Sequence, residues 1–231
     1  MEAGTLSSLY AAAIADPTRP AADLELDAQR SPATMMALAG VKPGERVVDV
    51  MPGRGYASRL FSHIVGPEGH VVALVLPDFA EMVKQGLDSL NAWLSESARK
   101  NVEVRIAELG ALAADAPFDC VWIALNYHDI AGYMGEAKAR DFCRDAAALL
   151  RSGGTFIVID HAAREGRGAR DARALHRIEQ ATVVDNALQA GFVLDGHSDC
   201  LVNAADSHIE PVFTQELRGH TDRFALKFRK P

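Results

Sequence analysis

The stretch RVVDVMPGRGY, residues 46–56, joins a short apolar strand to a loop that contains two glycines. The strand is expected over Arg46–Val50, and a helix is expected from the end of the loop to about Ile64. Glycine lets a backbone turn sharply and approach a ligand, and a helix N-terminus presents free N–H groups. Ser58 stands where a dinucleotide fingerprint has its third glycine, so the stretch indicates a nucleotide-like ligand other than NAD.

Strand and helix patterns alternate outward from this stretch. Further strands are expected over His70–Leu76, Val102–Ile106, Phe118–Leu125, Thr155–Ile159, Phe192–Cys200 and Arg223–Arg229, and long helices over Asp78–Ala98, Gly135–Leu150 and Asp171–Ala190. Strands that alternate with helices predict an α/β fold with a doubly wound, mostly parallel sheet. Ligands of such sheets bind beyond the carboxyl ends of the strands, so the residues that follow each strand are the candidate site residues.

The first 40 residues precede this pattern and are expected to form a helical cap. An apolar helix over 6–15 ends at the sequence DPTRP, because proline cannot continue a helix. A second short helix over 33–39 has Ser31 as its expected N-cap. We therefore expect residues 1–40 to act as a lid over a catalytic domain that spans residues 41–231.

The composition of the 231 residues limits the classes of function. With 24 basic and 31 acidic residues the formal net charge is −7, which argues against nucleic-acid binding. The three cysteines have no paired spacing, so neither a disulfide framework nor a structural zinc site is expected. No apolar run reaches the length of about 18 residues that a membrane span needs, and we expect a cytoplasmic protein. The apolar run near the N-terminus lacks the basic start of an export signal, and export is the alternative.

Several motifs resemble one enzyme family. The pattern D-x-x-P-G-x-G at Asp49–Gly55 resembles motif I of the class I S-adenosylmethionine-dependent methyltransferases. FDCVWIAL (118–125) resembles their fourth strand, LLRSGGTFIVIDH (149–161) their turn and fifth strand, and AGFVLDG (190–196) the start of their terminal hairpin. A little-characterised bacterial group of predicted methyltransferases is resembled more narrowly, through DAQRSP (27–32), MPGRGY (51–56), NYHD (126–129), DHAA (160–163), LHRI (175–178) and RGHTDRFALKFRKP (218–231).

This resemblance implies a Rossmann-like sheet of seven strands in the order 3-2-1-4-5-7-6, with S-adenosylmethionine as methyl donor and S-adenosylhomocysteine as product. The cofactor-binding residues that it implies are Asp49, Met51, Pro52, Gly53, Gly55, Tyr56, Glu108 and Asn126. The chain departs from the family at two positions. Met51 stands where the first glycine usually is, and Val75 stands where an acid usually holds the ribose hydroxyls. Asp78 lies three residues after Val75 and is the expected substitute.

Histidines and carboxylates follow the fourth and fifth strands. His128 is the expected general base, because imidazole titrates near neutral pH, and Asp129 or Asp160 would orient it. The expected substrate-binding residues are Tyr127, His161, His176, Arg177 and Arg30. Two interpretations of this group are open, a polar pocket with an acid/base pair and a divalent metal site. No His-x-x-x-His spacing supports the metal, so no metal ligand is assigned.

Together these features predict methyl transfer from S-adenosylmethionine to an oxygen, nitrogen or sulfur nucleophile of a small molecule. One alternative is the same fold with other chemistry, a lyase or hydrolase assisted by His/Asp or by a metal. Another is a non-catalytic protein that binds a ligand. No nucleic acid and no membrane partner is expected, and a homodimer is compatible with the sequence.

Overall fold

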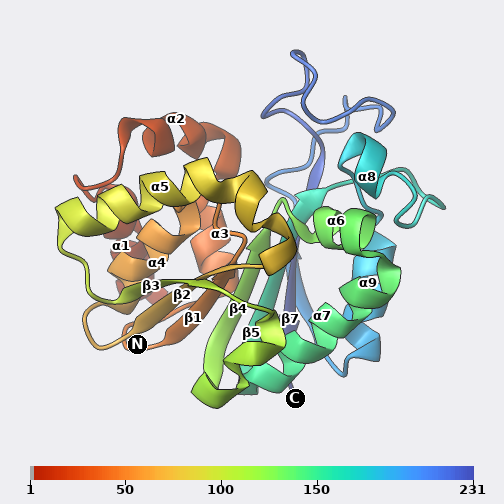
Figure 1. Ribbon diagram of the computed structural model, residues 1–231. Coiled ribbons are helices and arrows are strands. Elements are labelled where there is room, and N and C mark those ends of the chain that lie inside the picture. Colours follow the sequence, from red (N-terminus) through yellow and green to blue (C-terminus); the bar gives the residue numbers. More distant parts are fainter. Residues whose placement is uncertain (1–2) are drawn as a thin grey trace.

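Strand β1 (Arg46–Val50) lies at the centre of a seven-stranded sheet, between β2 (His70–Val75) and β4 (Phe118–Ala124). The sheet order is β3-β2-β1-β4-β5-β7-β6, so the computed structural model, which describes residues 3–231, confirms the predicted fold (Figure 1). The remaining strands are β3 (Val102–Ile106), β5 (Leu150–His161), β6 (Val193–Ser198) and β7 (Arg223–Arg229), of which β3 and β6 form the two edges. All pairs are parallel except those of β7, which runs antiparallel to β5 and β6.

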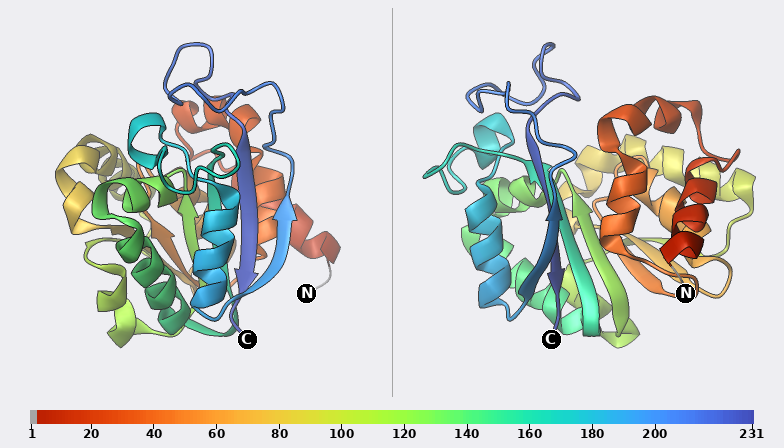
Figure 2. Two further views of the ribbon diagram at one scale, coloured as in Figure 1. Left: turned by 90° about the vertical axis from the view of Figure 1, so that its right-hand side faces the viewer. Right: turned by 180° about the vertical axis from the view of Figure 1, so that it is seen from behind.

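Successive side chains of β1 enter two hydrophobic cores on opposite faces of the sheet, Val47 one core and Val48 the other. The Val47 core is covered by α1 (Ala3–Ile14), α3 (Pro32–Ala39), α4 (Tyr56–Val65) and part of α5 (Ala80–Ser97). The Val48 core is covered mainly by α7 (Glu136–Leu149) and α9 (Gln180–Gln189) (Figures 1 and 2). Helices on both faces explain why β4 is apolar on both sides.

The chain reverses direction across the sheet between β1 and β4. It leaves β1 towards β2 and β3, and it then crosses back to β4 on the other side of β1. The loops that follow β1 and β4 therefore diverge, and a crevice opens at the carboxyl ends of these two strands. This is the position at which the sheet predicts a ligand.

The N-terminal segment contains one helix more than expected, α2 (Ala21–Arg30), between α1 and α3. Its sequence has no apolar face, and Asp23 is its one buried residue, so hydrophobic periodicity gives no sign of it. Ser31 separates α2 from α3 with a left-handed backbone (φ 45°) and makes no side-chain capping bond, contrary to its expected role. Residues 1 and 2 of the expected cap lie outside the described residues.

One further local prediction is wrong, and one segment folds without having been predicted. The helix expected over Asp171–Ala190 is divided into α8 (Ala172–Leu175) and α9, because His176 has a left-handed backbone (φ 54°). Ile178 in the break pairs with Ala162 beyond β5 instead. After β4 the chain forms two unexpected short helices, α6 (Tyr127–Asp129) and η3 (Ile130–Met134). Within residues 3–231, none of the helices combines the length and apolar character needed to cross a lipid bilayer.

Candidate active site

The loop between β1 and α4 has an unusual backbone at three positions. Met51, Gly53 and Gly55 all have positive φ angles, of 56°, 56° and 89°. A Cβ atom on Gly55 would also lie 2.5 Å from Leu90 Cδ1, so glycine is required there by both conformation and space. Met51 takes a left-handed conformation without being glycine, and its side chain is buried in the core. The family's glycine at this position is therefore matched in backbone shape though not in residue type.

A cavity of about 360 Å³ lies between this loop, the end of β4 and helix α2. We call this region the donor side. Six of the predicted site residues line it, namely Arg30, Met51, Pro52, Gly53, Tyr56 and Asn126. Helix α2, which lies at the end of the sheet where the parallel strands finish (Figure 2), contributes Ala22, Asp23 and Leu26 to the same wall. These α2 residues were not among the predicted site residues, because a charged segment without apolar periodicity gives no signal for a position beside a cavity.

Helix α2 is fixed to α4 by two sets of polar contacts. Asp23 accepts two hydrogen bonds from the buried guanidinium of Arg59, at 2.7 and 2.9 Å. Asp27 accepts a bond of 2.6 Å from the Tyr56 hydroxyl and forms a two-bond ion pair with Arg19. These contacts hold α2 against the cavity, and the expected role of residues 1–40 as a lid stays a prediction.

Arg30 is the exception among these charges. Its guanidinium lies 4.5 Å from the centre of the Tyr56 ring. Among residues 3–231 it has neither a hydrogen-bond acceptor nor an ion-pair partner, and burial lowers the pKa of Arg30. The Asn126 amide, on the opposite wall, donates to the carbonyls of Ala124 (2.7 Å) and Met51 (3.4 Å). Arg30 was expected to bind substrate, and that role stays a prediction; a cation without a partner beside a cavity is suited to an anionic group of a ligand.

Other predicted cofactor residues lie outside the cavity. The Asp49 carboxylate is buried behind the loop and accepts a bond of 2.6 Å from Ser58, so the cofactor contact expected of it is wrong. Burial raises the pKa of Asp49 to about 7, although Ser58 and Arg30 oppose the rise. Glu108 is exposed beside a separate, smaller pocket, and Asp78 is exposed on the short helix η1 (Pro77–Phe79). The adenine and ribose roles expected of Glu108 and Asp78 stay predictions.

Next to the donor side, His128 and Asp160 form a buried pair. His128 Nδ1 lies 2.6 Å from Asp160 Oδ1, and the His128 backbone N–H donates to Asp160 Oδ2 at 2.7 Å. Asp160 thus fixes the orientation of the ring, as expected of one of the two candidate acids. Burial alone would lower the pKa of His128, but the Asp160 and Asp129 carboxylates outweigh it and raise the pKa to about 10. A ring protonated at neutral pH donates rather than accepts a proton, so the predicted role of general base does not follow from this geometry.

The opposite edge of the His128 ring, which carries Nε2, lies beside Asp129 and His176. His128 Nε2 lies 3.2 Å from His176 Nδ1 and 3.3 Å from Asp129 Oδ1, and the last two atoms are 3.3 Å apart. We call His128, Asp129, Asp160 and His176 the acceptor side. His161 lies beside it, with its ring centre 5.8 Å from that of His128 and its Nδ1 2.7 Å from the Thr221 hydroxyl. Burial, together with the positive charge of His128, holds the pKa of His161 well below its usual range.

Two predicted substrate residues belong to the interior instead. The Tyr127 side chain is fully buried, and its hydroxyl contacts the Ala139 carbonyl and the Asn186 amide. Arg177 is also fully buried and makes two bonds to Asp206, of 2.9 and 3.0 Å. Neither residue has surface left for a substrate, so both expectations are wrong.

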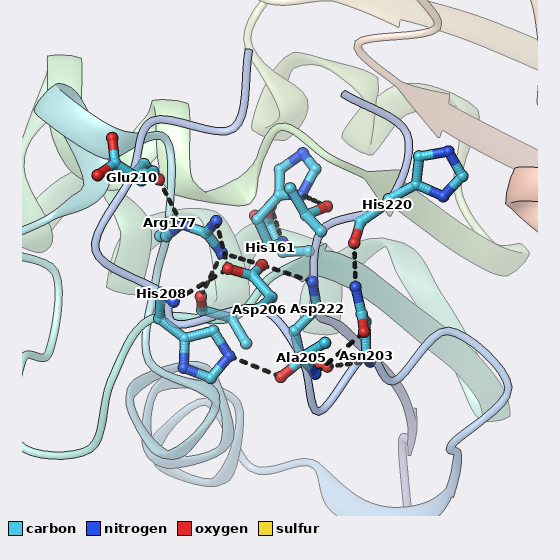
Figure 3. Close-up of polar contacts among 12 residues, drawn as sticks. His161, Arg177, Asn203, Ala205, Asp206, His208, Glu210, His220 and Asp222 are labelled. Atoms are coloured by element: carbon cyan, nitrogen blue, oxygen red, sulfur yellow. Dashed lines mark hydrogen bonds and ion pairs between the residues drawn. The ribbon is translucent and has the colours of Figure 1, made fainter. Parts of the chain in front are cut away.

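Arg177 instead anchors the long segment 199–222 that connects β6 to β7. Its guanidinium also donates to the carbonyls of Ala162 and Glu210, so it joins the end of β5 to this segment. Figure 3 shows Arg177 pointing at Asp206, with the pair between His208 and Asp222 nearby. This network holds the segment close to His161 and the acceptor side.

The comparisons with known proteins identify the same enzyme class. A family model described as protein-L-isoaspartate(D-aspartate) O-methyltransferase matches residues 18–133. The ubiquinone/menaquinone biosynthesis C-methyltransferase UbiE of Pseudomonas fluorescens (strain Pf0-1) is 36% identical over 125 residues, which are 53% of this chain and 44% of that protein. The protein of the same name from Ectopseudomonas mendocina (strain ymp) is 34% identical over 124 residues, again 53% and 44%. The match therefore spans less than half of the length of these curated relatives.

Solved structures agree in fold. A SAM dependent methyltransferase from Aquifex aeolicus has a TM-score of 0.58 at 17% identity, covering 99% of this chain and 98% of that one. Fibrillarin from Aeropyrum pernix, in complex with natively bound S-adenosyl-L-methionine, has a TM-score of 0.54 at 14% identity, covering 88% and 76%. Identities this low establish the fold alone, whereas the family model spans half of the sequence and includes the loop after β1 and the end of β4. The chain therefore belongs to the family that this model describes, within the class I S-adenosylmethionine-dependent methyltransferases, and S-adenosylmethionine is its cofactor.

Proposed function

We propose that the enzyme transfers the methyl group to an oxygen, nitrogen or sulfur nucleophile of a small molecule. The observation that carries the proposal is the adjacency of the two sides of the site. Asn126 lines the donor cavity, and two residues later His128 begins the acceptor side. A methyl donor held by the first would therefore lie next to a nucleophile bound at the second. This arrangement favours methyl transfer over the lyase, hydrolase and non-catalytic alternatives.

On the donor side, the residues act by binding and orientation. The Arg30 guanidinium would hold the carboxylate of the donor, and Asn126, which lines the same cavity, would offer its amide oxygen to the amino group. The bound cofactor supplies an electrophilic methyl group on a sulfonium. Helix α2, fixed through Asp23, would exclude water from the reacting atoms. Most of the rate enhancement of such a transfer comes from positioning two reactants.

On the acceptor side, Asp129 and His176 are the groups that a substrate can reach. Their side chains are 15% and 21% exposed, whereas that of His128 is 2% exposed and that of Asp160 is fully buried. The Asp129 carboxylate would accept a hydrogen bond from the O–H or N–H of the nucleophile. The exposed ring of Phe213 lies 4.8 Å from His176, centre to centre, and offers an apolar surface for the rest of a small substrate.

The descriptions of the relatives suggest two candidate acceptor atoms for the methyl group, oxygen and carbon. The matching family model is described as an O-methyltransferase, which supports an oxygen acceptor. The curated relatives are described as C-methyltransferases, which makes a carbon acceptor the second candidate. Products labelled with ¹³C-methyl separate the two, because methyl groups on oxygen and on carbon have well-separated NMR shifts.

Calorimetric titration with S-adenosylhomocysteine tests the donor side. We expect wild-type protein to bind it, and Arg30→Met to bind it about 10- to 100-fold more weakly, because charge-assisted bonds contribute about 1.5–3 kcal/mol. Methylthioadenosine, which lacks the amino-acid part, should bind both proteins equally. Arg144→Met, on the exposed face of α7, is the control and should change neither affinity. Absence of binding by the wild type, or equal loss for both ligands in Arg30→Met, would overturn this assignment.

A further inference from the structure

We infer that His128, Asp129 and His176 form a binding site for a divalent transition-metal ion. One ligand atom of each residue lies within 3.3 Å of the other two, namely His128 Nε2, Asp129 Oδ1 and His176 Nδ1. The three atoms come from two segments 48 residues apart, which is why no linear spacing in the sequence reveals them. The site does not overlap the donor cavity.

The distances between the three ligand atoms suit one shared ion. They are 3.2, 3.3 and 3.3 Å, a nearly equilateral triangle. Bonds of about 2.0–2.2 Å from a metal to nitrogen or oxygen place neighbouring ligand atoms about 3.0–3.5 Å apart. The side chains therefore already have the separations of three ligands on one face of a metal ion.

The surroundings of the triangle hold the ligands in place. Asp160 binds Nδ1 of His128 and the backbone N–H of the same residue, so Nε2 lies beside the other two ligand atoms. An ion bound at Nε2 would displace the proton that this ring otherwise carries. A carboxylate behind a metal-binding imidazole is the common way to fix its orientation. His176 reaches the site because its left-handed backbone (φ 54°) ends α8 there. For a residue other than glycine, such a conformation costs free energy and marks a position at which the surrounding structure fixes the backbone.

The ligand types select the class of metal. Two imidazoles and one carboxylate, without a thiolate, favour Zn²⁺, Fe²⁺, Co²⁺ or Ni²⁺ over Mg²⁺ and Ca²⁺, which prefer oxygen alone. Three protein ligands leave further coordination positions open. Asp129 and His176 are partly exposed, and the exposed rings of Tyr133 and Phe213 flank His176. The open positions therefore face the surface that a small molecule can reach.

The role of the ion rests on the proposed function. A hydroxyl of the acceptor that binds the ion becomes more acidic, and its proton passes to solvent at the exposed face. The oxygen then forms a bond to the methyl carbon while the bond from this carbon to sulfur breaks, which leaves a neutral thioether. A second oxygen of the substrate would occupy another open position. The site thus indicates an acceptor with two neighbouring oxygens, such as a hydroxyl beside a carbonyl or carboxylate.

The test uses full-length protein from which metal has been stripped with a chelator. Titration with Zn²⁺, and with Co²⁺ followed by its visible absorption, should reveal one ion per chain. Asp129→Asn and His176→Ala should each weaken Co²⁺ binding at least 100-fold and change its spectrum. His197→Ala removes an exposed histidine that also lies beside a carboxylate, outside the site, and should have no effect. Circular dichroism checks that each variant is folded.

S-adenosylhomocysteine binding, measured in parallel, separates the two hypotheses. If the protein binds S-adenosylhomocysteine but not one metal ion per chain, the metal site is overturned and the proposed function is kept. The same holds if metal binds and Asp129→Asn and His176→Ala leave its binding unchanged. Stoichiometric metal that both variants release supports the site, whatever the result for S-adenosylhomocysteine.

Discussion

The donor side and the acceptor side differ in how their charged groups are partnered. On the donor side Asp23 pairs with Arg59 and Asp27 with Arg19, so these charges neutralise one another inside the protein. Arg30 has no partner among the described residues and faces the cavity. Buried charges that pair with one another hold the wall of the donor cavity in shape, whereas a charged side chain without a partner offers a contact to a ligand.

On the acceptor side Asp160 pairs with His128 in the interior, but Asp129 and His176 stay partly exposed beside this pair. Two imidazoles and a carboxylate direct their ligand atoms at one another, with Asp160 behind them. Replacing Asp129 or His176 should therefore weaken the binding of a cation or substrate more than it lowers the stability of the fold. The comparison predicts that the donor side is the more important of the two for stability.

The largest expected effect comes from breaking the buried ion pair that holds α2. Asp23→Ala leaves the Arg59 guanidinium buried without its partner, so we expect a loss of about 3–5 kcal/mol in the free energy of unfolding. Urea denaturation measures it. Asp88→Ala, on the exposed face of α5, is the control and should stay within about 0.5 kcal/mol. If Asp129→Asn costs as much as Asp23→Ala, the proposed difference between the two sides is wrong.

A second effect is a pH dependence of stability on the donor side. The pKa of Asp49 is about 7 in the folded protein and about 4 when unfolded, so folding takes up a proton between these values. The stabilising contribution is complete below about pH 4 and is lost as the pH rises through 7. We expect the free energy of unfolding to fall by about 2–4 kcal/mol between pH 4 and 8, at about 1.4 kcal/mol per pKa unit.

Asp49→Asn removes this titration and is the direct check. Its free energy of unfolding should change less than that of the wild type over the same pH range, because Asn keeps the shape but cannot ionise. Ser58 and the cations of Arg30 and Arg59 oppose the rise in the pKa of Asp49, so the pH range over which stability is lost is narrower than burial alone would make it. If the free energy of unfolding varies with pH in the same way in both proteins, a group other than Asp49 causes the pH dependence.

The fold was largely predictable from the sequence, because its signals are local. The bounds of β1, β3 and β7 follow from apolar runs or alternation between turn residues, and the order of the strands follows from the resemblance to a known family. Helix α2 could not be predicted in this way. It is held by ion pairs to Arg59 and Arg19, residues whose charge gives no periodic signal.

The site was predictable in position but only partly in role. His128, Asp129, Asp160 and His176 were all expected near one edge of the sheet, and the structure brings them together. The roles of Tyr127 and Arg177 were wrong, because a sequence motif does not reveal on which side of the chain a side chain is buried. A metal was an open but less favoured interpretation, because linear spacing gave no support for it. The three residues that would hold the ion come from two segments far apart in the sequence, and the backbone turn at His176 brings them together.

The smallest expected effect concerns the backbone of the donor loop. Met51 is buried with a left-handed φ of 56°, a conformation that costs a residue with a Cβ about 1–2 kcal/mol. Both Met51→Ala and Met51→Gly lose the packed side chain, but only glycine relieves this cost. We therefore expect Met51→Gly to be about 1 kcal/mol more stable than Met51→Ala in urea denaturation.

Met36 supplies the matched control for this difference, because it is equally buried but lies inside α3. There the order should reverse, with Met36→Gly about 1 kcal/mol less stable than Met36→Ala, since glycine disfavours an ordinary helix. Opposite signs at the two methionines would show that the donor loop keeps the glycine-like backbone of its family at the expense of local strain. The same sign at both would mean that the loop relaxes around Met51, and the donor side would then be less rigid than its ion pairs imply.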